Sequence, residues 1–408
     1  MIGWIVVLLG CDEGTNVDGV SSSGAFEDPE SGAVVSWYAD VQPLLEENCL
    51  SCHAEEGISF SLEDFQIAAA MAGPIAEVTA AGIMPPWPAD ETDCMPLMDP
   101  RVLEDDQIAL LQEWSDLGAP EGDPADTPEA DTSEESSIEL DVWKEMATAY
   151  SPDSTVNDDY RCFVVDPELE DDIYIAGAVV FPGNSSVVHH VILYTDPGNN
   201  SEALDAEDEG EGYSCFGGPG FNDTAVIGGW VPGSQGLVLP DDSGLKVSAG
   251  TKIIMQMHYH ADGSEGSDQT AFALDLEESV GTEVYLYPMA DTNLNIPAGA
   301  EDHIEGWSSS VNYGIDFKLY GGTPHMHLLG TSFTVSVTPP DGEEQCLIHI
   351  PDWDFDYQQF YRLMEPFVVE DGSTLSVECI YDNPTDSEVN WGDGTEEEMC
   401  LVYAMISL

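Results

Sequence analysis

The sequence predicts a multidomain protein in which a small α-helical domain precedes two all-β sandwich domains. Residues 34–118 contain amphipathic helical patterns, with apolar side chains spaced three and four positions apart. Residues 119–137 are rich in Pro, Asp and Glu and have hardly any large apolar side chain, which is typical of a linker. From Ile138 onward the chain consists of short β-branched and aromatic runs that Gly, Pro, Asn and Asp interrupt.

Length and charge set the first limits on function. A chain of 408 residues suggests two to four domains, each able to bury its own core. Seven Lys and Arg against 80 Asp and Glu give a net charge of −73, which excludes nucleic acid as a partner because phosphates need a basic surface. The acidic excess could attract cations or a basic redox partner. A solvated acidic coat is the favoured interpretation.

The N-terminus has the pattern of an export signal. Residues 1–10 form an apolar run that is too short to span a bilayer, and Leu8-Leu9-Gly10-Cys11 resembles the lipobox of bacterial lipoproteins, in which the cysteine is lipidated. The alternative is an apolar leader before a structural cysteine, and the usual basic n-region is missing. Residues 1–11 are thus predicted as a signal and 12–33 as a flexible tether. We expect a periplasmic or cell-surface protein that a lipid alone anchors to a bacterial membrane.

Nine cysteines support an oxidising compartment. Two belong to Cys49-Leu50-Ser51-Cys52-His53, the attachment sequence for c-type haem, in which two thiols bind the vinyl groups and the histidine binds iron. A zinc or thiol-redox interpretation needs further ligands or a βαβ context, and neither is visible nearby. Residues 34–118 are therefore predicted as a cytochrome c-like domain with haem c.

The sixth haem ligand is less defined by the sequence. Gly82-Ile83-Met84-Pro85-Pro86 resembles the Met-Pro loop of class I cytochromes c, which favours Met84, although it could be only a core residue of a loop. Other methionines in range are Met71, Met95 and Met98. Residues 102–117 have the spacing of a closing amphipathic helix that ends at Gly118.

Beyond the linker, eight segments have strand patterns: 173–181, 187–194, 252–260, 283–287, 317–320, 331–337, 375–381 and 401–406. We divide them into β-domains at residues 138–280 and 281–408. Histidines are bunched in and beside these strands, as His189-His190, His258-Tyr259-His260 and His325-Met326-His327. Side chains two apart on a strand share a face, so His325 and His327 can bind one ion. His189 and His190 can do so only at a strand end or irregularity. Plain core histidines are the alternative.

Four motifs together resemble the copper type II monooxygenases, the family of peptidylglycine α-hydroxylating monooxygenase and dopamine β-monooxygenase. They occur in the family's order: Val188-His189-His190-Val191, Gln256-Met257-His258-Tyr259-His260, Thr323-Pro324-His325-Met326-His327-Leu328-Leu329-Gly330 and Glu397-Glu398-Met399-Cys400-Leu401-Val402-Tyr403. The resemblance implies two jelly-roll-like β-domains with one copper each. It assigns an electron-storing copper to His189, His190 and His258, leaving His260 as a bystander.

The same resemblance assigns the oxygen-reacting copper to His325, His327 and Met399. Imidazole suits copper in both oxidation states and a thioether favours Cu(I), in agreement with that division. Tyr403 and Gln256 stand at family positions near the oxygen-side and electron-side coppers. The resemblance also implies a Cys379–Cys400 disulfide, and Cys215 could replace the missing family partner of Cys162.

The function expected from the resemblance is an exported monooxygenase that hydroxylates a C–H bond of a small-molecule or peptide substrate with O2. Electrons would come from ascorbate or a redox protein, relayed by the fused haem. Peptide-processing members grip the peptide carboxylate with an Arg where this chain has Thr323, so a C-terminal glycine peptide is doubtful. The alternative is an electron-transfer or copper-binding protein without hydroxylase activity.

Overall fold

The computed structural model describes residues 34–54, 59–98, 100–128, 140–156, 158–231, 234, 236–260, 266–355, 357–392, 394 and 396–408. The predicted signal 1–11 with Cys11, the tether 12–33 and much of the predicted linker lie outside these residues. Within the described part, no helix is both long and apolar enough to cross a membrane. Residues 35–408 form one compact unit.

The helices lie before residue 127, apart from α6 (Ser201–Glu207). They are a π-helical turn η1 (Trp37–Val41), α1 (Gln42–Asn48), α2 (Leu50–His53), α3 (Phe65–Ala70), α4 (Ala72–Ala80), α5 (Asp105–Asp116) and a 3-10 turn η2 (Pro124–Asp126). A capping box starts α5, since Glu104 and Gln107 bond each other's backbone N–H groups. Leu111 and Trp114 on its inner face are fully buried.

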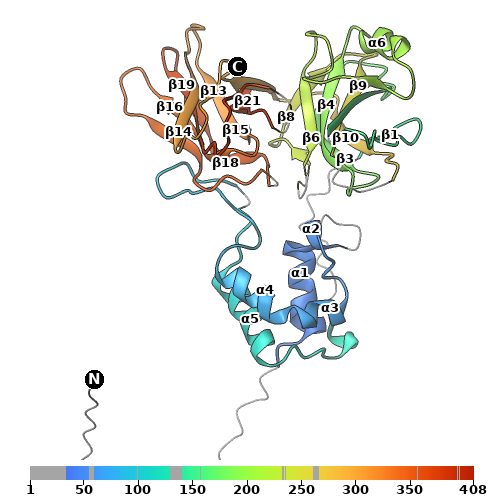
Figure 1. Ribbon diagram of the computed structural model, residues 1–408, viewed down its shortest axis with the longest axis vertical. Coiled ribbons are helices and arrows are strands. Elements are labelled where there is room, and N and C mark those ends of the chain that lie inside the picture. Colours follow the sequence, from blue (N-terminus) through green and yellow to red (C-terminus); the bar gives the residue numbers. More distant parts are fainter. Residues whose placement is uncertain are drawn as a thin grey trace, which may run out of the picture. The chain divides into compact units, whose positions relative to one another are not determined.

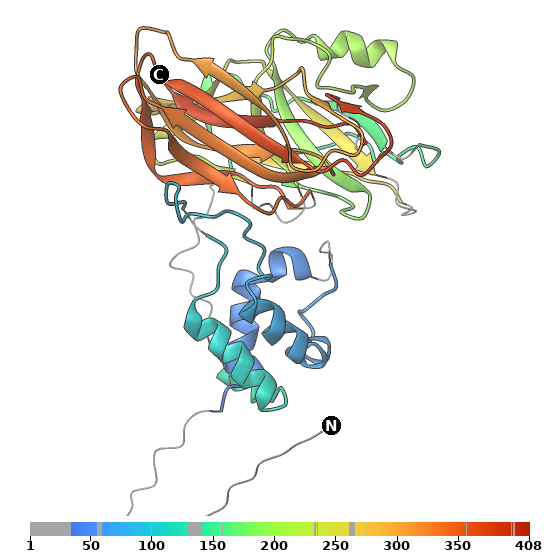
Figure 2. The same ribbon diagram turned by 60° about the vertical axis from the view of Figure 1, so that its left-hand side comes forward.

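The predicted fold class is wrong in its separate α-helical cytochrome c-like domain. The structure is mainly β, and its short helices belong to the same compact unit as the strands. The chain between α4 and α5 leaves the helices and joins the C-terminal strands, where Cys94 is disulfide-bonded to Cys346 and Leu97 forms a β-bridge with Leu363 (Figures 1 and 2). The sequence could not reveal this excursion, because Cys94 pairs across 252 residues.

The first group of strands, coloured green to yellow in Figure 1, forms two sheets. One has the order β1 (Val142–Glu145), β10 (Ala271–Glu277), β3 (Ile173–Phe181), β8 (Ser243–Val247), β11 (Thr282–Glu283), with β7 (Leu237–Val238) also paired to β3. The other has the order β5 (Tyr213–Ser214), β2 (Asp158–Val165), β9 (Lys252–His260), β4 (Val188–Asp196), β6 (Val226–Trp230). The strand predictions for 173–181 and 252–260 are confirmed by β3 and β9.

The second group of strands, orange to red in Figure 1, also forms two main sheets. Their orders are β12 (Tyr285–Ala290), β21 (Leu401–Ser407), β15 (Phe317–His325), β18 (Tyr361–Val369), and β14 (His303–Ser310), β19 (Thr374–Tyr381), β16 (Gly330–Thr338), β17 (Gln345–Ile350). A small pair joins β13 (Asn295–Ile296) to β20 (Val389–Asn390).

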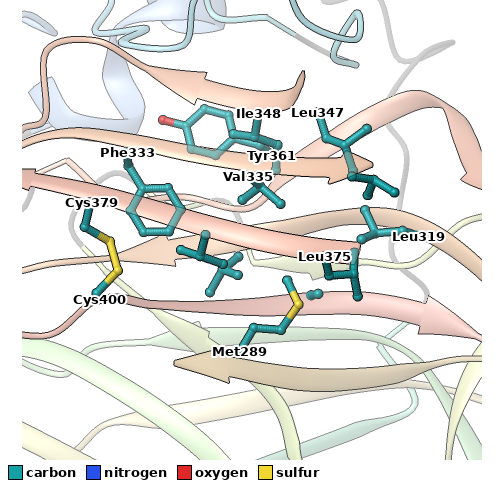
Figure 3. Packing of buried hydrophobic residues seen from close by; sticks show 14 of the residues in the cluster. Met289, Leu319, Phe333, Val335, Leu347, Ile348, Tyr361, Leu375, Cys379 and Cys400 are labelled. Atoms are coloured by element: carbon teal, nitrogen blue, oxygen red, sulfur yellow. A yellow bond between two sulfur atoms is a disulfide. The ribbon is translucent and has the colours of Figure 1, made fainter. Parts of the chain in front are cut away.

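Each strand group encloses its own apolar core. Side chains such as Phe333, Val335 and Leu375 fill the space between the sheets of the second group, next to the Cys379–Cys400 disulfide (Figure 3). The core of the first group also includes Tyr320 and Met405, which come from β15 and β21 of the second group. Shared apolar burial therefore fixes the two groups against each other.

Three disulfides join Cys94 to Cys346, Cys162 to Cys215, and Cys379 to Cys400. The third is the pair that the family resemblance implies. The second joins Cys162 to Cys215, which the sequence offered only as a possible replacement partner, and the first was not foreseen. Disulfides persist in oxidising surroundings, which indicates a secreted or extracellular protein.

Candidate functional site

His189, His190 and His258 converge on one point because the pairing of β4 with β9 is irregular there. Val188 pairs with Tyr259 and His190 pairs with His258, so His189 is the extra residue of a β-bulge. The bulge brings neighbouring histidines to one side of the sheet, as the sequence required. The three residues each place a ligand-capable atom within 4.8 Å of the others. Nδ1 of His190 lies 3.3 Å from that of His189 and 3.4 Å from that of His258.

The surroundings orient His258 and favour the neutral form of His190. Asp158 at the start of β2 lies with Oδ1 2.9 Å from Nε2 of His258, and Tyr160 stacks on the His258 ring at 4.2 Å. A proton on Nε2 leaves Nδ1 of His258 as the lone-pair donor. Burial, and after it His258 and His189, lower the pKa of His190 well below its usual range. Neutral imidazoles are the form that binds metal. The side chain of His260 is outside the described part.

His325 and His327 form a second pair with ring centroids 5.0 Å apart. The sequence placed both on one strand, but β15 ends at His325 and His327 belongs to the turn that follows. Nδ1 of His325 lies 2.6 Å from Oε1 of Gln358, and Nδ1 of His327 lies 2.9 Å from the Glu397 carbonyl oxygen. Both Nδ1 atoms therefore act as donors, and both Nε2 atoms keep a lone pair for a metal. Burial, and next His327, lower the pKa of His325 to about 3.

A buried carboxylate organises the turn of the second pair. Glu398 is fully buried and accepts hydrogen bonds from the backbone N–H groups of His327, Leu329 and Met399, at 2.8, 2.6 and 3.3 Å. Burial raises the pKa of Glu398 to about 7, against the opposing effect of these three bonds. One side chain thus positions the backbone of both His327 and Met399.

Met399 approaches the second pair from the segment before β21. It is 7% exposed, its carbonyl oxygen accepts the Tyr381 hydroxyl at 2.7 Å, and its neighbour Cys400 is disulfide-bonded to Cys379. A thioether beside two imidazoles is a donor set that suits Cu(I), and the first set of three imidazoles suits copper in either state. Both donor sets therefore fit copper.

The two histidine sets open on one cavity of about 560 Å³, whose lining includes His189, His190, His325, His327 and Met399. Phe355 lies between the sets. Its ring stacks on His189 with centroids 5.0 Å apart and meets the His327 ring edge-on at 5.9 Å.

The chain segment of Phe355 also supports His325. The Phe355 carbonyl accepts the Gln358 amide at 2.8 Å, and Gln358 in turn contacts His325. One segment therefore touches both histidine sets.

Tyr403 and Gln256 line the same cavity. Tyr403 pairs with Thr323 between β21 and β15, and Gln256 donates its amide to the Cys215 carbonyl at 2.9 Å. The sequence predictions had not identified four residues that support the histidine sets, namely Asp158, Glu398, Phe355 and Gln358. Glu398 is adjacent to Met399, but among 80 acidic residues nothing in the sequence marks it as buried.

The Cys49-x-x-Cys52-His53 motif is at α2, one helical turn long. Burial, and next the charge of Cys52, raise the pKa of the Cys49 thiol to about 11, which disfavours a thiol-redox role. Nδ1 of His53 lies 2.9 Å from the Phe60 carbonyl, so Nε2 is left with a lone pair for iron. Met84 lies in the turn after α4, is 39% exposed, and donates its backbone N–H to the Val78 carbonyl.

Two imidazole-rich donor sets on a mainly β protein are two candidate metal sites that share one cavity. Residues 289–406 match the model of the family "Copper type II ascorbate-dependent monooxygenase, C-terminal domain". That segment includes His325, His327, Met399 and Tyr403. The match supports the family that the sequence motifs indicate.

Known relatives agree with this assignment. The human "DBH-like monooxygenase protein 1" is 27% identical over 256 residues, covering 56% of this chain and 40% of the relative. The mouse "DBH-like monooxygenase protein 2" is 27% identical over 263 residues, covering 57% of this chain and 40% of the relative. The chain thus spans about 40% of the length of these curated relatives. These findings are similarities to proteins named as monooxygenases, and the family match covers residues 289–406.

Among solved structures, the empty top-component particle of cowpea mosaic virus aligns over 61% of this chain and 89% of its own, with 10% identity and a TM-score of 0.27. A TM-score this low supports no inference about fold or function.

Proposed function

We propose that the protein is a copper-dependent monooxygenase that hydroxylates a C–H bond with O2. The observation that carries the proposal is a pair of donor sets, one of three imidazoles and one of two imidazoles beside a thioether, that open on one cavity. Copper at these sets would supply one-electron chemistry and O2 activation. The balanced reaction is R–H + O2 + two electrons + two protons → R–OH + H2O.

The chain's own residues have separable tasks in this proposal. His325, His327 and Met399 hold the oxygen-side metal, and Glu398 fixes the backbone of two of them. His189, His190 and His258 hold the electron-side metal, and Asp158 orients His258. Tyr403 faces the substrate. Ascorbate or a redox protein supplies the electrons.

Metal analysis combined with EPR tests the proposal. We expect two copper ions per chain and two uncoupled Cu(II) signals in the oxidised protein. His258→Ala should remove one signal and His325→Ala the other. His303→Ala is the matched control, because His303 on β14 bonds Glu305 at 2.8 Å and is outside the cavity lining.

The results that would overturn the proposal are equally concrete. Zinc or empty sites would refute copper binding. Copper-loaded protein that consumes no O2 with any reductant would favour electron transfer or copper binding without hydroxylation.

We further propose that Cys49 and Cys52 attach haem c, with His53 as one iron ligand and Met84 as the other. The orientation of His53 by the Phe60 carbonyl supports this. Such a haem would pass electrons to the electron-side copper. If His53→Ala left copper reduction and turnover unchanged, the relay would be rejected.

The remaining predictions from the sequence are kept as proposals. They are the β-domains 138–280 and 281–408, the linker 119–137, the signal 1–11 with lipidation at Cys11, and the tether 12–33. They place the protein at a bacterial periplasmic or outer surface. Labelling with a radioactive fatty acid, compared between the native chain and Cys11→Ser, tests the anchor.

A further inference from the structure

The cavity that the two histidine sets share differs sharply in charge from the rest of the protein. The chain carries 80 acidic and 7 basic residues. Among the described residues that line the cavity, none is Asp, Glu, Lys or Arg. Asp158 and Glu398, which bond the histidine sets, are not part of the lining either. The walls instead carry large aromatic side chains, among them Trp230, Phe360 and Trp391.

The sheet beside the second histidine pair determines what lies next to a bound substrate. Thr323 and His325 are two residues apart on β15, so their side chains share one face. Thr323 pairs with Tyr403 and His325 with Leu401 on β21, which pair in turn with Pro288 and Ala290 on β12. All six residues line the cavity. The platform therefore consists of apolar groups, the imidazole of His325 and the hydroxyls of Thr323 and Tyr403.

Such a site treats charged and neutral ligands very differently. A carboxylate or ammonium group that enters the cavity gives up its hydration. Without a partner of opposite charge this costs roughly several kcal/mol. A neutral ligand loses little, because apolar and aromatic surface replaces water and a hydroxyl can satisfy one polar group.

From this platform and lining we infer that the substrate is a neutral, largely apolar molecule with an aromatic or similarly flat group and at most one hydrogen-bonding handle. Thr323 and Tyr403 bind that handle beside the oxygen-side metal. The described side chains of the lining offer no partner of opposite charge to a carboxylate-bearing peptide or to a protonated amine. The inference rests on the proposed function for its reaction, but ligand binding tests it separately.

Three probes with one skeleton measure the selectivity: 3-phenylpropanamide, 3-phenylpropanoate and 3-phenylpropylammonium. Isothermal titration calorimetry on the full-length, metal-free protein gives the binding constants of the lining itself, because a bound Cu(II) ion would pair directly with a carboxylate. We expect the amide to bind at least about tenfold more tightly than either ion. Equal or tighter binding of an ion, or no binding of the amide at millimolar concentration, would overturn the inference.

A positive charge introduced at Thr323 should shift the affinities in a known direction, in favour of the carboxylate probe. Thr323→Arg should raise the affinity for 3-phenylpropanoate about tenfold or more without improving the amide, because a guanidinium pairs with carboxylate. Tyr313→Arg is the control, since Tyr313 is 67% exposed and outside the lining. It should change neither constant. If Thr323→Arg does not fold, the order of the three affinities in the native protein still tests the inference.

Failure of this inference and of the proposed function can be told apart. Copper content, EPR signals and O2 uptake report on the function. The order of affinities among the three probes reports on the substrate class alone.

Discussion

The two histidine sets are assembled by different structural means. The first is built on two paired strands, where a bulge at His189 and the direct pairing of His190 with His258 bring the rings together. The second lies at a strand end and in a turn, and Glu398 and Gln358 hold it from other segments. Backbone pairing thus defines one site, whereas side-chain hydrogen bonds define the other. We therefore expect the second to be more sensitive to single substitutions.

The largest effect is expected at Glu398. Glu398→Ala leaves the backbone N–H groups of His327, Leu329 and Met399 without their acceptor in a buried place. We expect the free energy of unfolding to fall by about 3–5 kcal/mol and the oxygen-side copper to be lost, with the electron-side copper retained.

Urea denaturation and metal analysis measure these two effects. Glu396→Ala, at an exposed neighbour, is the control and should change neither. Equal behaviour of the two variants would show that the turn does not depend on Glu398.

The next effect compares the residues that orient one histidine in each set. Asp158→Ala removes the partner of Nε2 of His258, and Gln358→Leu removes the partner of Nδ1 of His325. Each change should weaken copper binding at its own site by about 10–100-fold, as loss of such supporting hydrogen bonds does.

Competition with a copper chelator, followed by EPR, measures each site separately. The comparison predicts the larger loss for Gln358→Leu, because no β-bulge holds His325 in place. A larger loss for Asp158→Ala would reverse that ranking.

A smaller effect is expected at Phe355, which contacts both sets without binding a metal. Phe355→Ala removes the ring between His189 and His327, with a loss of about 1–2 kcal/mol in unfolding free energy. Copper content should stay at the native level. Pulsed EPR should report a broader distribution of copper–copper distances than in the native protein or in Phe355→Leu. An unchanged distribution would mean that Phe355 does not fix the separation.

The smallest effect concerns the end of β9 remote from His258. Lys252 lies 2.5 Å from Asp166, whose side chain is 50% exposed. Lys252→Met should cost at most about 1 kcal/mol at neutral pH and leave copper binding unchanged.

The hydrogen bond from Lys252 lowers the pKa of Asp166 from 3.8. A lowered carboxyl pKa stabilises the fold above the unfolded value, and this stabilisation disappears as pH falls through the folded value. The difference between native and variant in thermal denaturation should therefore shrink below about pH 4. A difference that persisted unchanged in stronger acid would contradict the assignment.

The sequence predicted most residues of both donor sets but few of the residues that support them. The family resemblance selected His189, His190 and His258, because strand spacing alone accepts His260 as well as His258; the required irregularity at His189-His190 is present in the pairing of β4 with β9. The turn at His327 and the burial of Glu398 depend on contacts across about 70 residues, which no local pattern encodes. The helical domain was mispredicted for the same reason, because the segment around Cys94 pairs with strands that are far away in the sequence.

The Cys94–Cys346 disulfide closes a covalent ring that contains α5, residues 119–137, which we propose as a linker, and the entire first strand group. A protease that cuts once within the linker would therefore release nothing. Both fragments would stay joined and migrate as one band under non-reducing conditions, and a reductant would separate them. The linker can thus be cleaved without detaching the Cys49-x-x-Cys52-His53 segment from the strands that carry the histidines.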